Sequence, residues 1–253
     1  MKLVTEPFNR SDIDELYNFI VDTIQTSYVG YYPEEAITHF IEYSNKEGIL
    51  EDAQDNYVIV VKDNNKIIGT GTLKYTHIQR VFVSPHYQGK GLGKLIMYDL
   101  ENKAILNHLK LVELHSSLFA KQFYDRLGYK MFKMGKVAVE NGELLYFQRM
   151  AKRLDANQDS THYNFRKKQF RVVKNDGIDI EVDLETSFHF YQNEALIYAE
   201  YSGGEVEYGE IFGLIENQTI DFYYSHVNLV GGKTQGQSKY EISIVDDKIQ
   251  FIG

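Results

Sequence analysis

The stretch VFVSPHYQGKGLGKLIMYDLE, residues 81–101, decides the fold of the N-terminal part of the chain. Three glycines, Gly89, Gly91 and Gly93, separate an apolar, strand-like segment from a segment with helical periodicity. The first N–H groups of a helix have no intrahelical partner and lie at the positive end of its dipole. Because glycine has no Cβ, a ligand can approach these groups closely. The stretch therefore predicts a site for a phosphate-containing ligand.

Two basic side chains, Lys90 and Lys94, add positive charge to this segment. Neither of two common phosphate-binding motifs fits it. A P-loop needs glycine at position 88 and serine or threonine at position 95, where the chain has Gln88 and Leu95. In the dinucleotide fingerprint the third glycine would come one residue later. A glycine-rich turn without a ligand remains the structural alternative.

Composition limits the classes of function. The chain has 253 residues, 43% of them hydrophobic, which is enough for two domains with their own cores. A net charge of −9 argues against nucleic acid or an anionic membrane as a partner, unless a local basic patch overrides the average. The chain has no cysteine, and its eight histidines show no metal-ligand spacing, so we expect no metal. We find neither a membrane-span pattern nor a signal peptide, and expect a cytoplasmic protein.

The character of the sequence changes near residue 155. Before it, strand-like and helix-like segments alternate; after it, short alternating strands follow one another. The polar segment between them carries no apolar periodicity, which is typical of a linker. We therefore predict a first domain over residues 1–152, a linker over 153–164 and a small second domain over 165–253.

The expected order of the first domain is strand, two helices, three strands, helix, strand, helix and two strands. The last helix, in FAKQFYDRLG, should end at Gly128 in a left-handed conformation. The last two strands should form a hairpin across Asn141-Gly142, a strong type I′ turn signal.

Two motifs in this order resemble those of the GCN5-related N-acetyltransferase (GNAT) family. VFVSPHYQGKGLG resembles its acetyl-CoA motif, a strand, an x-P-x-Y turn and Q/R-x-x-G-x-G/A, with Gln88, Gly91 and Gly93 at the signature positions. AKQFYDRLGY resembles the second motif, A-x-x-F-Y-x-x-x-G-F, with Tyr129 in place of the final phenylalanine. Its other matching residues are Ala120, Phe123, Tyr124 and Gly128. The resemblance covers about residues 1–150.

The resemblance implies an α/β (α+β) fold with a mixed central sheet and flanking helices, and acetyl-CoA as co-substrate. In such a fold the strand QRVFVSP separates from LVELHSS, and the pantetheine arm lies in the gap like an added strand. The pyrophosphate lies on the amides of residues 88–94. Ser117 stands where many relatives have asparagine. The expected cofactor-binding residues are Val81, Phe82, Val83, Gln88, Gly89, Lys90, Gly91, Leu92, Gly93, Lys94 and Ser117.

Acetyl transfer to an amine needs a base, an oxyanion contact and an acid for the departing thiolate. The motif assigns the acid to Tyr124, since a phenol keeps its proton at neutral pH. We assign the base to His77, where relatives often carry glutamate, with Glu113 and His115 as rivals. A backbone N–H near Val81 should contact the oxyanion. Simple packing roles for Tyr124 and His77 remain alternatives.

Acceptor specificity in this family usually comes from the segment between the first two helices and from the closing hairpin. Here that segment is SYVGYYPEEA, residues 27–36. It should form an aromatic and acidic wall that favours a cationic amine, unless it is only a solvated loop before a capped helix. The side chains concerned are Tyr28, Tyr31, Tyr32, Glu34 and Glu35. The acceptor is left as a small-molecule or peptidyl amine, and a homodimer is left open.

The second domain is expected to be all-β, an antiparallel barrel or sandwich. YAEYSGGEVEYGEIFGLIE and the following IDFYYSHVN resemble a small bacterial β-domain that is sometimes labelled N-acetylglutamate synthase. Its aromatic side chains should pack a core, with a ligand cavity as the alternative. They include Phe188, Phe190, Tyr198, Tyr201, Phe222 and Tyr224. We assign no role to His226 or Glu207.

Two functions follow from the sequence. The favoured one is an N-acetyltransferase that moves the acetyl group of acetyl-CoA to a primary amine by direct attack. The alternative is a non-catalytic binding module that senses acyl-CoA, with the β-domain contacting a ligand or partner. The presence of Tyr124 beside the glycine motif favours the enzyme, since a sensor has no use for an acid.

Overall fold

The computed structural model describes residues 3–139, 142–154, 163–165, 168–172, 181–245 and 248–252. The chain divides into two compact units, Met1–Tyr129 with Met134–Asp155, and Lys130–Lys133 with Ala156–Gly253. Of the expected linker, residues 155–162 lie outside the described part. No helix among the described residues combines the length and apolar character needed to cross a membrane.

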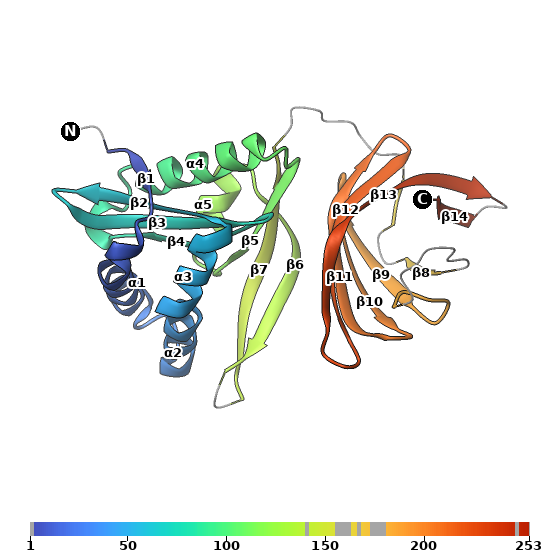
Figure 1. Ribbon diagram of the computed structural model, residues 1–253, viewed down its shortest axis with the longest axis horizontal. Coiled ribbons are helices and arrows are strands. Elements are labelled where there is room, and N and C mark those ends of the chain that lie inside the picture. The colour runs from blue at the N-terminus through green and yellow to red at the C-terminus, as the bar shows by residue number, and fades with distance from the viewer. Residues whose placement is uncertain are drawn as a thin grey trace. The chain divides into compact units, whose positions relative to one another are not determined.

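The first unit contains a seven-stranded mixed sheet with helices on both faces (Figure 1). Its strands are β1 (Thr5–Pro7), β2 (Tyr57–Asp63), β3 (Lys66–Lys74), β4 (His77–Val83), β5 (Leu111–Ser116), β6 (Lys130–Ala138) and β7 (Leu144–Arg153). Its helices are α1 (Ile13–Tyr28), α2 (Glu34–Tyr43), α3 (Lys46–Asp55), α4 (Leu92–Leu106) and α5 (Lys121–Arg126), with short 3-10 turns at Arg10–Asp12 and Pro85–Tyr87. The strand order is β1-β2-β3-β4-β5-β7-β6, and β4 and β5 are parallel. This arrangement confirms the predicted fold class.

The prediction of two helices between the first two strands was wrong, because the structure has a third, α3. Asn45 caps this helix, and its side-chain oxygen accepts a hydrogen bond from the Gly48 amide at 2.7 Å. A glycine in the first turn and a run of charged residues hid the helical pattern. The buried face of α3 consists of Ile49 and, unusually, a carboxylate, Asp52.

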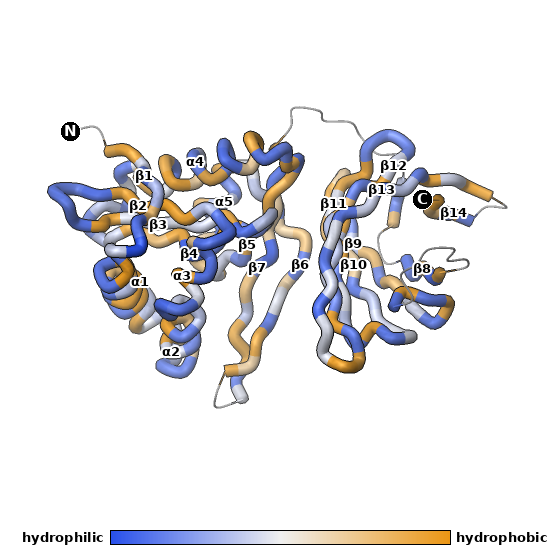
Figure 2. Tube along the Cα trace, in the orientation of Figure 1, coloured by the Kyte–Doolittle hydropathy of each residue, from blue (hydrophilic) through white to orange (hydrophobic). Residues whose placement is uncertain are grey.

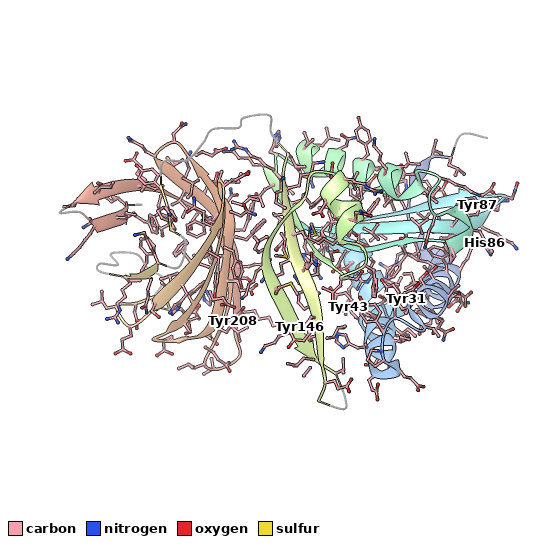
Figure 3. All side chains as sticks on the ribbon, turned by 180° about the vertical axis from the view of Figure 1, so that it is seen from behind. Tyr31, Tyr43, His86, Tyr87, Tyr146 and Tyr208 are labelled. Atoms are coloured by element: carbon pink, nitrogen blue, oxygen red, sulfur yellow. The ribbon has the colours of Figure 1, made fainter. Side chains whose placement is uncertain are left out.

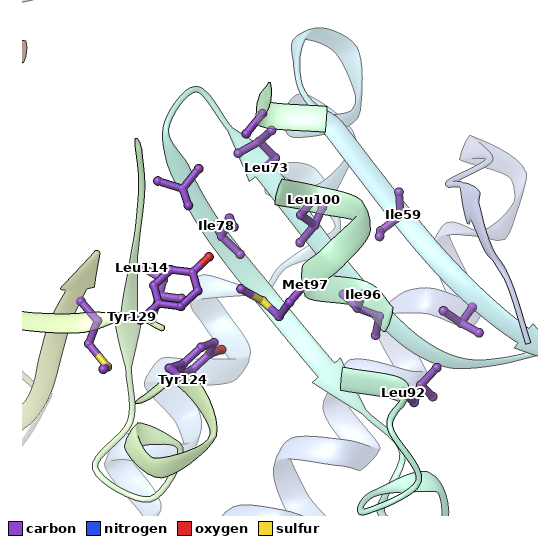
Figure 4. Close-up of a cluster of buried hydrophobic side chains, with 14 of the residues drawn as sticks. Ile59, Leu73, Ile78, Leu92, Ile96, Met97, Leu100, Leu114, Tyr124 and Tyr129 are labelled. Carbon is purple, nitrogen blue, oxygen red and sulfur yellow. The ribbon is translucent and has the colours of Figure 1, made fainter. Parts of the chain in front are cut away.

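The two faces of the sheet bury separate apolar clusters. Ile59 and Val61 of β2 pack with α4, whereas Val60 between them packs with α1 and α3, as the alternation of a strand requires. Tyr124 and Tyr129 belong to the α4 cluster (Figure 4). Polar and apolar residues alternate along α4 (Figure 2), and its buried apolar residues belong to this cluster.

The ends of the last two elements agree with the sequence. α5 is followed by Gly128, which has a left-handed φ of +92°. Strands β6 and β7 are neighbours in the sheet and form the expected closing hairpin. Gly142 has the positive φ of +80° that its turn needs, while its predicted turn partner Asn141 lies outside the described residues.

The second unit is an antiparallel sheet of seven strands that follow one another in sequence and curl into a half-barrel (Figure 1). They are β8 (Gln169–Arg171), β9 (Ser187–Asn193), β10 (Leu196–Gly203), β11 (Val206–Glu216), β12 (Thr219–Asn228), β13 (Lys233–Val245) and β14 (Lys248–Ile252). In the described strands no pairing joins β8 to β14. The all-β antiparallel class is confirmed.

Aromatic side chains fill the core of the second unit, as the packing interpretation expects. Phe165 is fully buried and lies edge-on to Phe170, Phe190 and Phe251. Tyr198 is also fully buried but lies outside this cluster, to which its neighbours in the strand, Ile197 and Ala199, belong. The side chain of Glu207 is exposed.

A buried histidine lies in a polar network beside this core. His226 bonds the Tyr201 hydroxyl through Nδ1 at 2.8 Å and Glu181 through Nε2 at 2.6 Å. Asn228 and Thr234 donate hydrogen bonds to the same carboxylate. The hydrogen bonds from His226, Asn228 and Thr234 lower the pKa of Glu181 to about 2.

Because of this network, we expect the free energy of unfolding of the second unit to decrease at acidic pH. The folded state holds Glu181 ionised down to about pH 2, whereas an unfolded glutamate takes up its proton near its usual pKa of 4.5. Its contribution is therefore complete above about pH 4.5 and is lost as the pH falls toward 2. Urea unfolding of the full chain, followed by circular dichroism, should show this loss in the wild type and in Glu207→Gln. Other ionised carboxylates remain, so a Glu181→Gln variant should lose less stability over this range than the wild type, and an equal loss would contradict the prediction.

Candidate functional site

The central strands of the first unit separate after two pairs. β4 and β5 are joined at His77↔Glu113 and Ile78↔Leu114, and no further pair links these two strands in the described residues. On its other edge β4 stays paired with β3 up to Val83. One edge of β4 beyond Ile78 is thus left for another extended group, as expected from the sequence.

A β-bulge lies directly after this separation. Thr72 pairs with Gln79, but Thr70 pairs with Phe82, so two residues of β4, Arg80 and Val81, face one residue of β3. Arg80 takes a left-handed φ of +51° to make the bulge. No sequence pattern predicts this bulge, because arginine is uncommon in this conformation.

The side chains of the expected cofactor strand fix β4 to both faces of the sheet. Val81 and Val83 pack on the α4 cluster, and Phe82 packs on the opposite cluster. These contacts leave the main chain to face the gap. Gln88, after the strand, donates a hydrogen bond from Nε2 to the Val83 carbonyl at 3.2 Å and ties the glycine turn to the strand.

The glycine turn presents open backbone at the start of α4. Gly89 and Gly91 have φ values of +73° and +87°, and a Cβ on either would meet no atom within 4 Å. Gly91 is the N-cap of α4. The side chain of Leu92, the first residue of this helix, is buried in the core. Residues 88–91 are exposed, so the first amides of α4 can be reached by a ligand.

The charges and the third glycine of this turn have other contacts. The Lys90 ammonium lies over the Tyr87 ring, 5.2 Å from its centroid, while Lys94 is exposed. A Cβ on Gly93 would lie 3.1 Å from the Phe123 ring of α5. Gly93 thus allows α4 and α5 to pack closely, which is a different reason for glycine from the one the motif suggests.

The segment after β5 positions α5. The Ser117 hydroxyl accepts a hydrogen bond from the Ala120 amide at 3.2 Å, closing the turn before the helix. Tyr124 is 8% exposed and lies beside Phe123 and Tyr129 in the α4 cluster (Figure 4). Burial, and then the nearby Tyr28, raises the pKa of Tyr124 well above its usual range. The phenol therefore keeps its proton at all physiological pH values.

The candidate bases form one cluster where β4 and β5 begin to separate. Nδ1 of His77 lies 3.9 Å from a Glu113 oxygen, a distance for ion pairing but too long for a hydrogen bond, and the His77 ring meets His115 with centroids 4.6 Å apart. Arg149 of β7 donates a hydrogen bond to the other Glu113 oxygen at 3.2 Å. Burial raises the pKa of Glu113, but His77, Arg149 and His115 outweigh it and lower the value to about 2.

The aromatic segment between α1 and α2 packs against the turn after β5. Tyr28, Tyr32 and Phe40 form edge contacts, and Tyr31 meets Phe119 with ring centroids 4.9 Å apart. The two acidic residues expected in this wall instead occupy the first turn of α2, where they favour the helix dipole; they are Glu34 and Glu35.

A cavity of about 180 Å³ opens between this segment and the closing hairpin. Most of its lining residues are apolar, and they include one acidic residue, Glu143. The lining residues are Tyr32, Pro33, Ala36, Leu118, Val139, Glu143, Leu144, Leu145 and Tyr146. Tyr31 and Tyr146, from the two sides, are labelled in Figure 3. The two segments expected to bind the acceptor are thus brought together.

Several residues of the site had no signal in the sequence. Arg149 and Phe119 belong to no motif, and only the fold brings them to Glu113 and Tyr31. Over the described part of the chain, no group of three histidine, aspartate or glutamate side chains is placed to hold a metal ion.

Comparison with known proteins agrees with this geometry. The family model of the acetyltransferase (GNAT) domain matches residues 28–154, half of the chain. The chain belongs to the GNAT acetyltransferase family, which confirms the resemblance. Residues 163–251 match a model of avidin-like proteins.

Individual relatives are distant. The uncharacterized protein YyaT of Bacillus subtilis (strain 168) is 28% identical over 102 residues, 39% of this chain and 67% of that protein. A GCN5-related N-acetyltransferase from Rhodopseudomonas palustris has the same fold, with a TM-score of 0.55 and 21% identity over 60% of this chain and 96% of its own. PaiA N-acetyltransferase from Thermoplasma acidophilum, determined in complex with coenzyme A, has a TM-score of 0.49 and 18% identity over 60% of this chain and 99% of its own.

We expect Gly93→Val to destabilise the protein by about 1–3 kcal/mol, because the added methyl groups overlap the Phe123 ring. Thermal unfolding of a double-mutant cycle with Phe123→Leu should show a smaller loss in the leucine background. Lys94→Val, at the adjacent exposed position, is the control. Equal losses from Gly93→Val in both backgrounds would show that the contact does not set the requirement for glycine.

Proposed function

We propose that the first unit is an N-acetyltransferase that moves the acetyl group of acetyl-CoA to a primary amine by direct attack. The observation that carries this proposal is the separation of β4 from β5 directly before an exposed glycine turn, in a chain of the GNAT family. The free edge of β4 suits the extended pantetheine arm, and the amides at the start of α4 suit its pyrophosphate.

The residues of β4 and of the turn fit acetyl-CoA. The backbone of Val81–Val83 would hold the pantetheine, and the amides of residues 88–94 would hold the phosphates. Gly89 and Gly91 leave open the space that a side chain would fill. Bound in this way, acetyl-CoA supplies an activated acetyl thioester. An amide near Val81, at the bulge, would donate to the thioester oxygen.

Two side chains would move the protons. His77 takes the proton of the attacking ammonium through water, and the charge of Glu113, 3.9 Å from Nδ1, stabilises the imidazolium that forms. Glu113 itself is a poor base because its pKa is about 2. As the nitrogen–carbon bond forms and the carbon–sulfur bond breaks, Tyr124 gives its proton to the sulfur and regains one from the new amide nitrogen, which must lose its second proton. His115 remains the neighbouring alternative to His77.

The cavity beside the aromatic segment supports an acceptor with an apolar substituent. Its lining is mostly aliphatic and aromatic, which favours an alkyl or aryl group over a sugar. Glu143 suits the cationic end of an amine. The proposed acceptor is thus a small or peptidyl amine. The proposal includes no nucleic acid or lipid surface as a partner, and it places the reaction in the cytoplasm.

We expect Tyr124→Phe and His77→Gln each to lower kcat by roughly 10²–10⁴-fold, the usual contribution of an acid or base. Thiol release from acetyl-CoA measures this cleanly, because the protein has no cysteine of its own. Glu113 stays ionised above about pH 2, so it should contribute no acidic limb to the kcat/KM profile between pH 5 and 8.

The control is binding of desulfo-CoA, measured by calorimetry, which should be unchanged in both variants. Wild-type kcat in folded Tyr124→Phe would remove the acid from the mechanism. A wild-type protein that binds CoA but acetylates no amine in a panel of alkylamines, polyamines, amino acids, aminoglycosides and peptides would instead be an acyl-CoA sensor.

For the acceptor, kcat/KM should rise along a series of primary alkylamines, by roughly fourfold for each methylene that enters the cavity. Leu144→Asp should flatten this series, since it places a charge in the apolar lining. Met134→Asp is the matched control, because Met134 is equally exposed, at 44%, but does not line the cavity. Equal rates for methylamine and hexylamine would contradict the apolar acceptor.

A further inference from the structure

We propose that Asp52 is a positioning residue for acetyl transfer, which acts through Arg80 to hold the bulge of β4 in place. This inference rests on the proposed function, since the bulge carries the amide assigned to the thioester oxygen. Asp52 belongs to α3, the helix that the sequence pattern did not reveal, and touches neither substrate nor cofactor site itself.

The contacts of Asp52 depend on the bulge. Its Oδ2 accepts hydrogen bonds from both Gln79, at 2.7 Å, and Arg80. In a regular strand, successive side chains point to opposite faces of the sheet, so a single carboxylate could not bind both. The extra residue of the bulge brings Gln79 and Arg80 to the α3 face together. Asp52 therefore recognises the bulged form of β4 and stabilises it over the regular form.

Two features of Arg80 are energetically unfavourable, and an ion pair with a purely structural role would not require them. Its backbone is left-handed, with a φ of +51°, and its buried Nε finds no hydrogen-bond partner among the described residues. The guanidinium is held all the same: it pairs with Asp52, bonds the Tyr43 carbonyl at 3.4 Å and lies over the Tyr43 ring. Such retained strain points to a functional constraint on this residue.

The other contacts make this device rigid. Asp52 is 2% exposed, and its Oδ1 accepts a hydrogen bond from Lys74 at 2.7 Å. Tyr43 donates a hydrogen bond to the Gln79 carbonyl oxygen, Oε1, at 2.8 Å. Burial raises the pKa of Asp52, but Lys74 and Arg80 outweigh this effect and lower it. Together these residues form the Asp52 lock.

The position of the lock connects it to the chemistry. Arg80 lies two residues past Ile78, the last residue of β4 that pairs with β5. If the bulge relaxed to regular strand, each following residue would shift by one and its side chain would turn to the opposite face. The backbone of Val81 would then no longer point where the proposed oxyanion contact needs it.

The test compares Arg80→Ala, Arg80→Gly and Asp52→Asn with the wild type. Alanine loses the lock and keeps the backbone strain, so kcat should fall about 100-fold, as a misplacement of about 1 Å can produce. Arg80→Gly also removes the contacts with Asp52, but glycine adopts a positive φ without strain. Its kcat should therefore be about tenfold higher than that of Arg80→Ala. Asp52→Asn should resemble Arg80→Ala. Desulfo-CoA affinity should fall less than kcat, because the glycine turn still binds the phosphates.

Lys46→Ala is the matched control, since it removes another ion pair of α3, the exposed one with Asp14, and should leave kcat unchanged. Folding is checked by thermal unfolding, with kcat measured well below the transition. Wild-type kcat in Arg80→Ala, or an Arg80→Gly variant as slow as Arg80→Ala, overturns the proposal. If Arg80→Ala does not fold, the comparison of Arg80→Gly with Asp52→Asn decides in the same way.

Hydrogen exchange separates this proposal from the proposed function. The peptide that covers residues 77–84 should exchange faster in Asp52→Asn and Arg80→Ala than in the wild type, Lys46→Ala or Arg80→Gly. A wild-type protein without turnover would contradict the acetyltransferase, while faster exchange would still support the lock. Equal exchange in all variants would overturn the lock whatever the activity.

Discussion

The first unit depends on one constraint: β4 must be paired on one edge and open on the other. Main-chain groups inside a protein need hydrogen-bond partners, and a strand that leaves its neighbour loses them unless a ligand or water supplies them. Here β4 keeps β3 along its length but releases β5 after Ile78. The bulge at Arg80, the turn at Gly89 and Gly91, and the placement of α5 all follow from keeping that opening in a folded sheet.

Charge is distributed around the opening in an unusual way. Glu113 and Asp52 are both largely buried and both stay ionised, because each is enclosed by basic groups from other strands. Burial raises the pKa of both Tyr124 and Tyr28, and a neighbouring phenol adds to each shift, Tyr28 to that of Tyr124 and Tyr32 to that of Tyr28. Carboxylates that stay ionised and phenols that keep their protons thus lie close to the same opening.

Residues whose role is local could be predicted from the sequence, whereas residues whose role depends on tertiary contacts could not. The turn at Gly89 and Gly91 and the terminator Gly128 need positive φ, which glycine itself signals. Asp52 and Arg80 gave no signal, because their contact exists only once β4 is bulged and α3 is packed beneath it. The motif predicted a glycine at position 93 for ligand binding, but only the packed structure shows that the Phe123 ring also leaves no room for a larger side chain there. The site assignments of Tyr124 and His77 stay predictions from the family motifs.

The second unit shows the same division. Its alternating strands and glycine turns predicted an antiparallel sheet, and its aromatic residues fill the core. The polar network of His226 could not be predicted, because Glu181 and Tyr201 reach it from distant parts of the chain.

The glycine turn also determines when the chain loses its freedom. Glycine has more conformations in the unfolded chain than any other residue, so fixing Gly89 and Gly91 in the left-handed region costs entropy during folding. A ligand that arrives later meets amides that already point outward and need no reorganisation. The entropy cost of ordering this turn therefore lowers the stability of the apoprotein and does not reduce the affinity for the ligand.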